Sequence, residues 1–177
     1  TLKILNSFKK KDIFYYWFKL KKNAQILSKQ QNEKSSLNFI TSKFNAIKEP
    51  PLKMIFDIAN FYKNANEYKD AIYYYDQIIS KIDIDSLNYS EILYRRGGSY
   101  ERIGDYKNSD KDLLKSLEIN PEDAYVLNYL AYSWLERNYK IDIALEMLET
   151  AYQSKSNDGY IIDSIGWAYY LTKDYIK

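Results

Sequence analysis

The stretch AYVLNYLAYSWLERNYKIDIALEMLETAYQS, residues 124–154, decides the fold, because its opening pattern returns about 35 residues later in GYIIDSIGWAYYL, residues 159–171. The matching positions are Leu127, Leu130, Ala131 and Trp134 in the first stretch and Ile162, Ile165, Gly166 and Tyr169 in the second. Apolar residues at this spacing indicate helices, and self-similarity at this period indicates stacked helical units. The sequence therefore predicts an all-α solenoid of antiparallel helical hairpins.

The same pattern occurs twice upstream and gives the predicted domain organisation. Each hairpin pairs a small residue on its first helix with one on its second, because two helices approach closely only where side chains are small. These pairs are Ala59 with Ala71, Gly97 with Ser109, and Ala131 with Ala144, and we expect Gly166 to be buried at a crossing in the same way. The predicted units are a basic helical hairpin over residues 1–51, which is a divergent repeat or a cap, then residues 52–89, 90–123, 124–158 and 159–177.

The amino-terminal hairpin is predicted from two helices, over about residues 12–29 and 34–47. Residues 1–50 carry 11 lysines and three acidic residues, a net charge of +8, whereas the rest of the chain carries −6. Lysines interleaved with aromatics in residues 8–22 are compatible with an anionic membrane surface or nucleic acid. They are explained more simply by a solvated helix whose aromatic side chains close the end of the core. We therefore expect no nucleic acid partner and keep membrane contact through this segment as an alternative.

The repeated residues resemble the tetratricopeptide repeat, whose pattern is W-x2-L-G-x2-Y, then A-x3-F, then P. The match runs from about Leu52 to the end of the chain and departs from the pattern at Arg96, where leucine is usual, and at Ser109, where alanine is usual. The resemblance implies a right-handed superhelix in which the first helix of each hairpin lines a concave groove. Residues 158–167 are similar to bacterial members, many of which are exported or lipid-anchored. The resemblance alone therefore favours the bacterial cell envelope over the cytoplasm.

The candidate binding residues are those that this resemblance places on the groove side of each first helix. They are Phe56, Asn60, Tyr94, Tyr125, Asn128, Tyr132, Tyr160, Asp163 and Trp167. Aromatic rings offer rigid contact area, and asparagine can bond a peptide backbone on both sides. Trp167 and Tyr132 are the expected anchors, because Trp and Tyr are enriched at binding hot spots. For any single tyrosine, packing between neighbouring repeats is the alternative. The set contains no cation, which favours an extended ligand with apolar side chains and neutral or basic flanks.

Composition excludes several kinds of chemistry. The chain has no Cys and no His, which excludes disulfides, thiolate and imidazole catalysis, and imidazole metal ligands. Its carboxylate pairs lie on stretches typical of solvated helix faces, and acid–base catalysis needs a desolvated site. We therefore predict no enzymatic activity, no cofactor and no metal site.

The predicted function is a protein–protein interaction scaffold or adaptor that binds a peptide segment or protein partner in its groove. The alternative is the recruiting repeat region of a larger enzyme whose catalytic domain lies outside this chain. The sequence begins at Thr1 and its last repeat stops near Lys173, where a second helix should begin, so we expect a fragment. Ile165, Tyr169 and Leu171 would then leave apolar surface exposed, which predicts self-association through the truncated carboxyl-terminal repeat.

Overall fold

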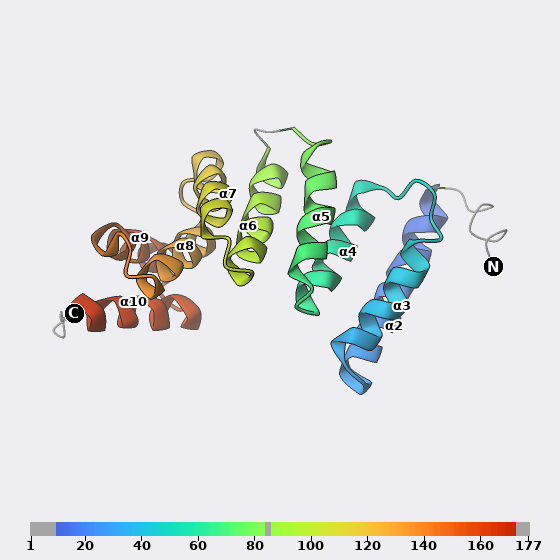
Figure 1. Ribbon diagram of the computed structural model, residues 1–177, viewed down its shortest axis with the longest axis horizontal. Helices are drawn as coiled ribbons and strands as arrows, with labels where there is room; N and C mark the ends of the chain where they lie inside the picture. Colours follow the sequence, from blue (N-terminus) through green and yellow to red (C-terminus); the bar gives the residue numbers. More distant parts are fainter. Residues whose placement is uncertain (1–9, 84–85, 173–177) are drawn as a thin grey trace. The chain divides into compact units, whose positions relative to one another are not determined.

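A computed structural model describes residues 10–83 and 86–172, without the side chains of residues 10–12 and 87. Within these ranges the chain is all helix and turn, with no strand, which confirms the predicted fold class (Figure 1). The helices are α2 (Lys10–Gln30), α3 (Glu33–Phe44), α4 (Leu52–Asn64), α5 (Tyr68–Ile79), α6 (Leu87–Arg102), α7 (Tyr106–Ile119), α8 (Ala124–Glu136), α9 (Ile141–Ser154) and α10 (Gly159–Thr172). They belong to two compact units, residues 1–81 and 82–177, which are described separately below.

Side chains that precede the helices fix several of the starting points. Asn32 accepts a hydrogen bond from the Ser35 backbone N–H at 2.8 Å at the start of α3. Asp123 does the same for Tyr125 at 3.0 Å before α8, and Asp158 for Tyr160 at 3.0 Å before α10. The first N–H groups of a helix have no partner inside it, so these short polar side chains satisfy them.

The turns inside the hairpins use residues that tolerate left-handed backbone. Asn66 (φ 63°), Gly104 (φ 77°) and Asn138 (φ 53°) follow the first helices of three hairpins, and Asn and Gly enter this region most readily. The third turn contains a second left-handed residue, Lys140 at φ 47°. This longer turn explains why Ala131 and Ala144 are one position further apart than the small residues of the other two hairpins.

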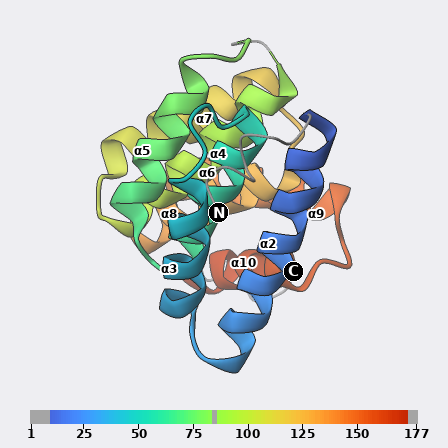
Figure 2. The same cartoon turned by 90° about the vertical axis from the view of Figure 1, so that its right-hand side faces the viewer.

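The first unit contains α2 to α5, and α2 and α3 lie side by side in both views of the chain (Figures 1 and 2). The apolar stripe predicted for α2 is confirmed at its centre, since Trp17, Leu20 and Ala24 are all buried. The Trp17 ring lies 5.9 Å from that of Phe44 on α3. The predicted second helix was too long, because α3 ends at Phe44 and Ile47 lies beyond it.

One buried carboxylate joins α2 to α4 in the first unit. Asp57 accepts a hydrogen bond from the Trp17 indole N–H at 2.9 Å. The same carboxylate pairs with Lys21 at 2.8 Å and with Lys53 at 3.2 Å. Burying a carboxylate is unfavourable unless it is paired, so these three donors are what allow an aspartate in this position.

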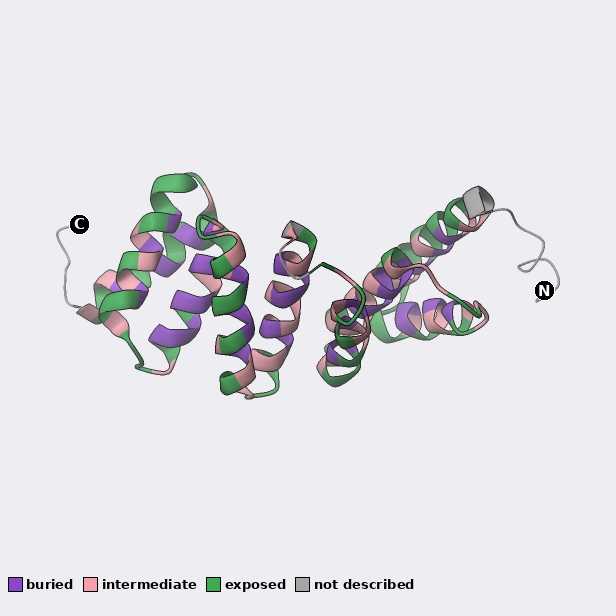
Figure 3. Cartoon of the chain, turned by 90° about the horizontal axis from the view of Figure 1, so that it is seen from above, coloured by how far each residue is buried: buried purple, intermediate pink, exposed green. Residues whose placement is uncertain are grey.

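The second unit contains α6 to α10, and the buried faces of its helices turn toward one another (Figure 3). The predicted crossings are confirmed in both of its hairpins. Ala131 and Ala144 are fully buried, and Gly97 is so close to α7 that an added Cβ would lie 2.9 Å from Leu113 Cγ. Gly166 does not fit the prediction, because it is exposed and no atom lies within 4 Å of an added Cβ.

The two departures from the repeat pattern have different outcomes in the structure. Arg96, in place of leucine, makes two hydrogen bonds to Asp112 on α7, at 2.6 Å and 2.7 Å. Both side chains are largely buried, so a polar pair replaces the apolar contact. Ser109 is fully buried like the usual alanine, and its hydroxyl is among the described buried polar atoms that lack a partner.

Three expectations concern the ends of the chain and of its repeats. The predicted start of a further helix near Lys173 lies outside the described residues. The predicted repeat boundaries stay a prediction. The helix α6 begins at Leu87, before the predicted boundary between residues 89 and 90. The expected exposure of Ile165 is wrong, because this side chain packs in the core of the second unit, whereas Leu171 is exposed. The neighbouring hairpin α8–α9 covers Ile165, so its burial does not require a further helix.

Candidate functional site

A pocket of about 240 Å³ in the second unit gathers four of the predicted binding residues. These are Asn128 and Tyr132 on α8 and Tyr160 and Asp163 on α10. The other lining residues are Glu101, Arg102, Tyr129, Ser133, Glu136 and Ser164. Its wall therefore comes from α6, α8 and α10.

Tyr129 on α8 lines the pocket and contacts α6. It was not among the binding residues predicted from the sequence. Its hydroxyl donates to the Glu101 carboxylate at 3.1 Å, and its ring packs edge-on against Tyr94 at 5.9 Å between centroids. Burial, and then the neighbouring Glu101 carboxylate, raises the pKa of Tyr129 above its usual value. Tyr129 stands four residues before Ser133, so the helical spacing of the lining residues on α8 was the signal that would have found it.

Two polar atoms of this pocket wall are buried without a hydrogen-bond partner. They are Asn128 Oδ1 and Ser133 Oγ, and the Ser133 side chain is only 5% exposed. Buried polar groups in proteins are nearly always hydrogen-bonded, and leaving one unpaired costs about 1–3 kcal/mol. Two such atoms beside one pocket therefore mark a place where a ligand can supply the missing bonds.

The pocket is negatively charged. Glu101, Glu136 and Asp163 line it together with one cation, Arg102. Partial burial, followed by the Glu136 and Asp163 carboxylates, raises the pKa of Tyr132. The two carboxylates belong to α8 and α10, and both line the pocket together with Tyr132.

Trp167, the other expected anchor, lines a neighbouring hollow on α10. This hollow has a volume of about 490 Å³ and is lined by Ile162, Asp163, Gly166, Trp167 and Tyr170. The Trp167 ring stacks on Tyr170 at 5.4 Å between centroids. Asp163 lines both cavities, so the two predicted anchors border adjoining sites and do not share one.

Tyr94 and Tyr125 are not in the lining of either cavity. Tyr94 packs on Tyr129 as described, and its burial raises its pKa. The Tyr125 hydroxyl donates to Asp158 at 3.3 Å, while Lys155 lies 5.0 Å from the centre of its ring. Both tyrosines therefore have packing roles, Tyr94 between α6 and α8 and Tyr125 between the start of α8 and the turn before α10.

Phe56 and Asn60 belong to the first unit, and their contacts are also internal. The Asn60 amide donates to the Phe56 carbonyl at 3.0 Å and accepts from the Tyr75 hydroxyl at 2.9 Å. The Phe56 ring lies 4.8 Å from the Lys53 ammonium and packs at 6.5 Å against the Tyr75 ring. These contacts hold α4 against α5, although Asn60 also borders a pocket.

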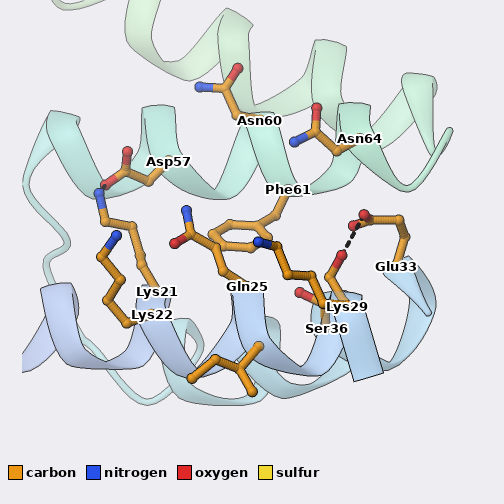
Figure 4. A pocket seen from close by; sticks show the side chains of 12 residues that line it. Lys21, Lys22, Gln25, Lys29, Glu33, Ser36, Asp57, Asn60, Phe61 and Asn64 are labelled. Carbon is orange, nitrogen blue, oxygen red and sulfur yellow. Dashed lines mark hydrogen bonds and ion pairs between the residues drawn. The ribbon is translucent and has the colours of Figure 1, made fainter. Parts of the chain in front are cut away.

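That pocket, about 620 Å³ in volume, lies between α2 and α4 (Figure 4). The side chains of Lys22, Gln25 and Lys29 extend from α2 toward α4, and Asn60 and Asn64 on α4 also line the pocket (Figure 4). The predicted binding set contains no cation, but Arg102 lines the pocket of the second unit and lysines of α2 line the pocket of the first unit. The lysines of α2 make the pocket of the first unit basic.

No helix in residues 10–83 and 86–172 combines the length and apolar character needed to cross a bilayer. No group of three or more carboxylates in the same ranges converges in the way that a metal ion requires.

Comparisons with known proteins agree with this architecture. No family model matches the chain. A TPR repeat-containing protein of Pseudomonas aeruginosa is 32% identical over 79 residues, which are 45% of this chain and 13% of that protein's length. The chain thus spans a small part of the curated relative that it matches.

Several solved structures share the fold at low sequence identity. MamA from Desulfovibrio magneticus RS-1, solved from residue 41 to its end, has a TM-score of 0.66 at 16% identity, over 88% of this chain and 85% of the solved MamA chain. A putative kinesin light chain from Podosopora anserina has a TM-score of 0.68 at 12% identity, over 89% and 87% of the two chains. The first TPR of Spaghetti (RPAP3), solved with the HSP90 peptide SRMEEVD, has a TM-score of 0.61 at 13% identity, over 69% and 93%.

These findings define the class of protein. The chain is a helical-repeat protein with the tetratricopeptide repeat fold, and the resemblance predicted from the repeated residues is confirmed.

Proposed function

We propose that the chain is a non-catalytic protein–protein interaction scaffold that binds an extended peptide segment in the pocket between α6, α8 and α10. The observation that carries the proposal is the combination of three tyrosine rings, Tyr129, Tyr132 and Tyr160, with the unpartnered Asn128 Oδ1 in one pocket. Rings supply contact area, and a buried acceptor without a partner suits a peptide N–H.

The likeness to known structures supports this function at the level of the fold. A domain of the same fold, the first TPR of Spaghetti (RPAP3), has been solved with a peptide bound. In the alternative, a recruiting region of a larger enzyme, the same pocket would also bind a peptide segment. The two are separated by the activity of the full-length protein, not by the pocket. Nucleic acid and a membrane surface are not part of the proposal.

Selection and titration of peptides test the proposal. Short random peptides displayed on phage are selected on the immobilised chain, and a selected peptide carrying a fluorescent label is titrated by anisotropy. Tyr132→Ala and Tyr160→Ala should each weaken binding by about 2 kcal/mol, or roughly 30-fold, as expected for hot-spot aromatics. Tyr160 is 82% exposed, so the second variant should retain the helicity and the melting temperature of the unchanged chain.

Glu146→Ala is the matched control. Glu146 is exposed on α9, outside the residues that line the two cavities, so its removal should leave peptide binding unchanged. The proposal is refuted if selected peptides bind equally well to the two tyrosine variants. It is also refuted if the selection returns no peptide that binds in solution.

A further inference from the structure

The pocket between α6, α8 and α10 has more specific chemistry than a general peptide groove. We infer that it holds a lysine or arginine side chain of the bound segment, between the Tyr132 and Tyr160 rings and the carboxylates of Glu136 and Asp163. This inference rests on the proposed function and names the residue type that the pocket selects.

The charges of the pocket wall favour a cation. The Glu101 carboxylate already accepts the Tyr129 hydroxyl, and Arg102 approaches it at 3.7 Å. By contrast, neither Glu136 nor Asp163 forms an ion pair with any residue whose position the structure describes. Two unpaired carboxylates on facing helices leave a negative potential that a bound ammonium or guanidinium group neutralises.

The aromatic rings favour the same ligand. Tyr129, Tyr132 and Tyr160 lie in the same wall as the carboxylates. A cation near a tyrosine ring is attracted by the negative face of the ring, by about 0.5–2 kcal/mol depending on desolvation. The long aliphatic stem of lysine or arginine also buries well against such rings. A volume of about 240 Å³ is small for a whole peptide and suits one side chain.

The buried acceptors complete the match. An ammonium group has three N–H donors and a guanidinium group has five, and neither group accepts hydrogen bonds. Asn128 Oδ1 and Ser133 Oγ are the two polar atoms of the wall that lack a partner. An apolar side chain would leave both atoms unpaired, and an acidic or phosphorylated side chain would face three carboxylates.

Two peptide mixtures that differ at one position test the inference. Both contain the same random flanks and blocked ends, with a central residue fixed as lysine or arginine in one mixture and as norleucine in the other. Binding to the whole chain is measured by anisotropy at low and high salt. We expect the basic mixture to bind about tenfold more tightly at low salt, with an advantage that shrinks at high salt because salt screens charge.

Charge-neutral variants locate the effect in this pocket. The double variant Glu136→Gln, Asp163→Asn keeps the shape of both side chains and should abolish the preference for the basic mixture. Glu146→Gln removes an exposed carboxylate from α9 and should leave the preference intact.

The possible outcomes separate the inference from the function on which it rests. If the two mixtures bind equally and Tyr160→Ala weakens both, the peptide-binding function stands and the inference is refuted. If the preference survives in the double variant, the basic residue binds elsewhere and the inference is also refuted. If neither mixture binds, the proposed function and the inference fall together.

Discussion

Gly97 allows the packing of α6 on α7 to be tested by a single methyl group. In an open helix interior, Gly→Ala stabilises by about 0.8–1.0 kcal/mol, because alanine loses less backbone freedom on folding. At Gly97 the added Cβ would lie 2.9 Å from Leu113 Cγ and 3.2 Å from Asp112 Cβ. Overpacking of this kind costs about 1–3 kcal/mol. We therefore expect Gly97→Ala to destabilise the second unit by about 1 kcal/mol net.

The next residue provides the matched control. A Cβ at Gly98 would meet only the ring and hydroxyl of Tyr129, at 3.4 Å or more, which is ordinary contact. Gly98→Ala should therefore be neutral or stabilising by up to about 1 kcal/mol. The two variants should differ by about 1–3 kcal/mol in the free energy of unfolding in urea, followed by the fluorescence of the buried Trp134. Equal stabilisation by both substitutions would show that α6 and α7 do not approach closely at Gly97.

Two further predictions concern polar groups. Arg96→Leu restores the usual residue of the repeat but removes the guanidinium group that donates two hydrogen bonds to the buried Asp112 carboxylate. It should therefore destabilise the second unit by about 3–5 kcal/mol in urea unfolding. Adding Asp112→Ala should recover part of this loss, and a neutral Arg96→Leu would contradict the argument. Burial, and then its neighbour Tyr62, raises the pKa of Tyr74 to about 12. The protonated Tyr74 hydroxyl should therefore stabilise the first unit fully below about pH 10, and this stabilisation should be lost as the pH rises toward 12. In urea unfolding followed by Trp17 fluorescence, Tyr74→Phe should make the fall of the midpoint over this pH range smaller. A pH dependence that is the same in Tyr74→Phe and the unchanged chain would contradict the prediction.

The sequence determined the features of this protein that depend on local pattern. Apolar residues at helical spacing fixed the helices, and small residues twelve or thirteen positions apart fixed the hairpin crossings, of which Ala59, Gly97 and Ala131 are buried. The sequence reveals the crossings because two helices can approach closely only where the residue at the crossing is small, so a small residue marks that position. Four of the residues that the family resemblance places on the groove side, on α8 and α10, line one pocket.

The tertiary structure decided which of the candidate residues line a common pocket. Tyr125 is held by Asp158 and Lys155, whereas Tyr132, about two helical turns further along the same helix, lines the pocket. Gly166 is exposed and Asn128 Oδ1 is buried without a partner. Each of these facts depends on which side chains of a neighbouring helix lie opposite the residue. The helical spacing of apolar residues in the sequence predicts only the face of the helix on which a residue lies. Whether a side chain on that face packs, pairs or remains available to a ligand is set by the partner helix.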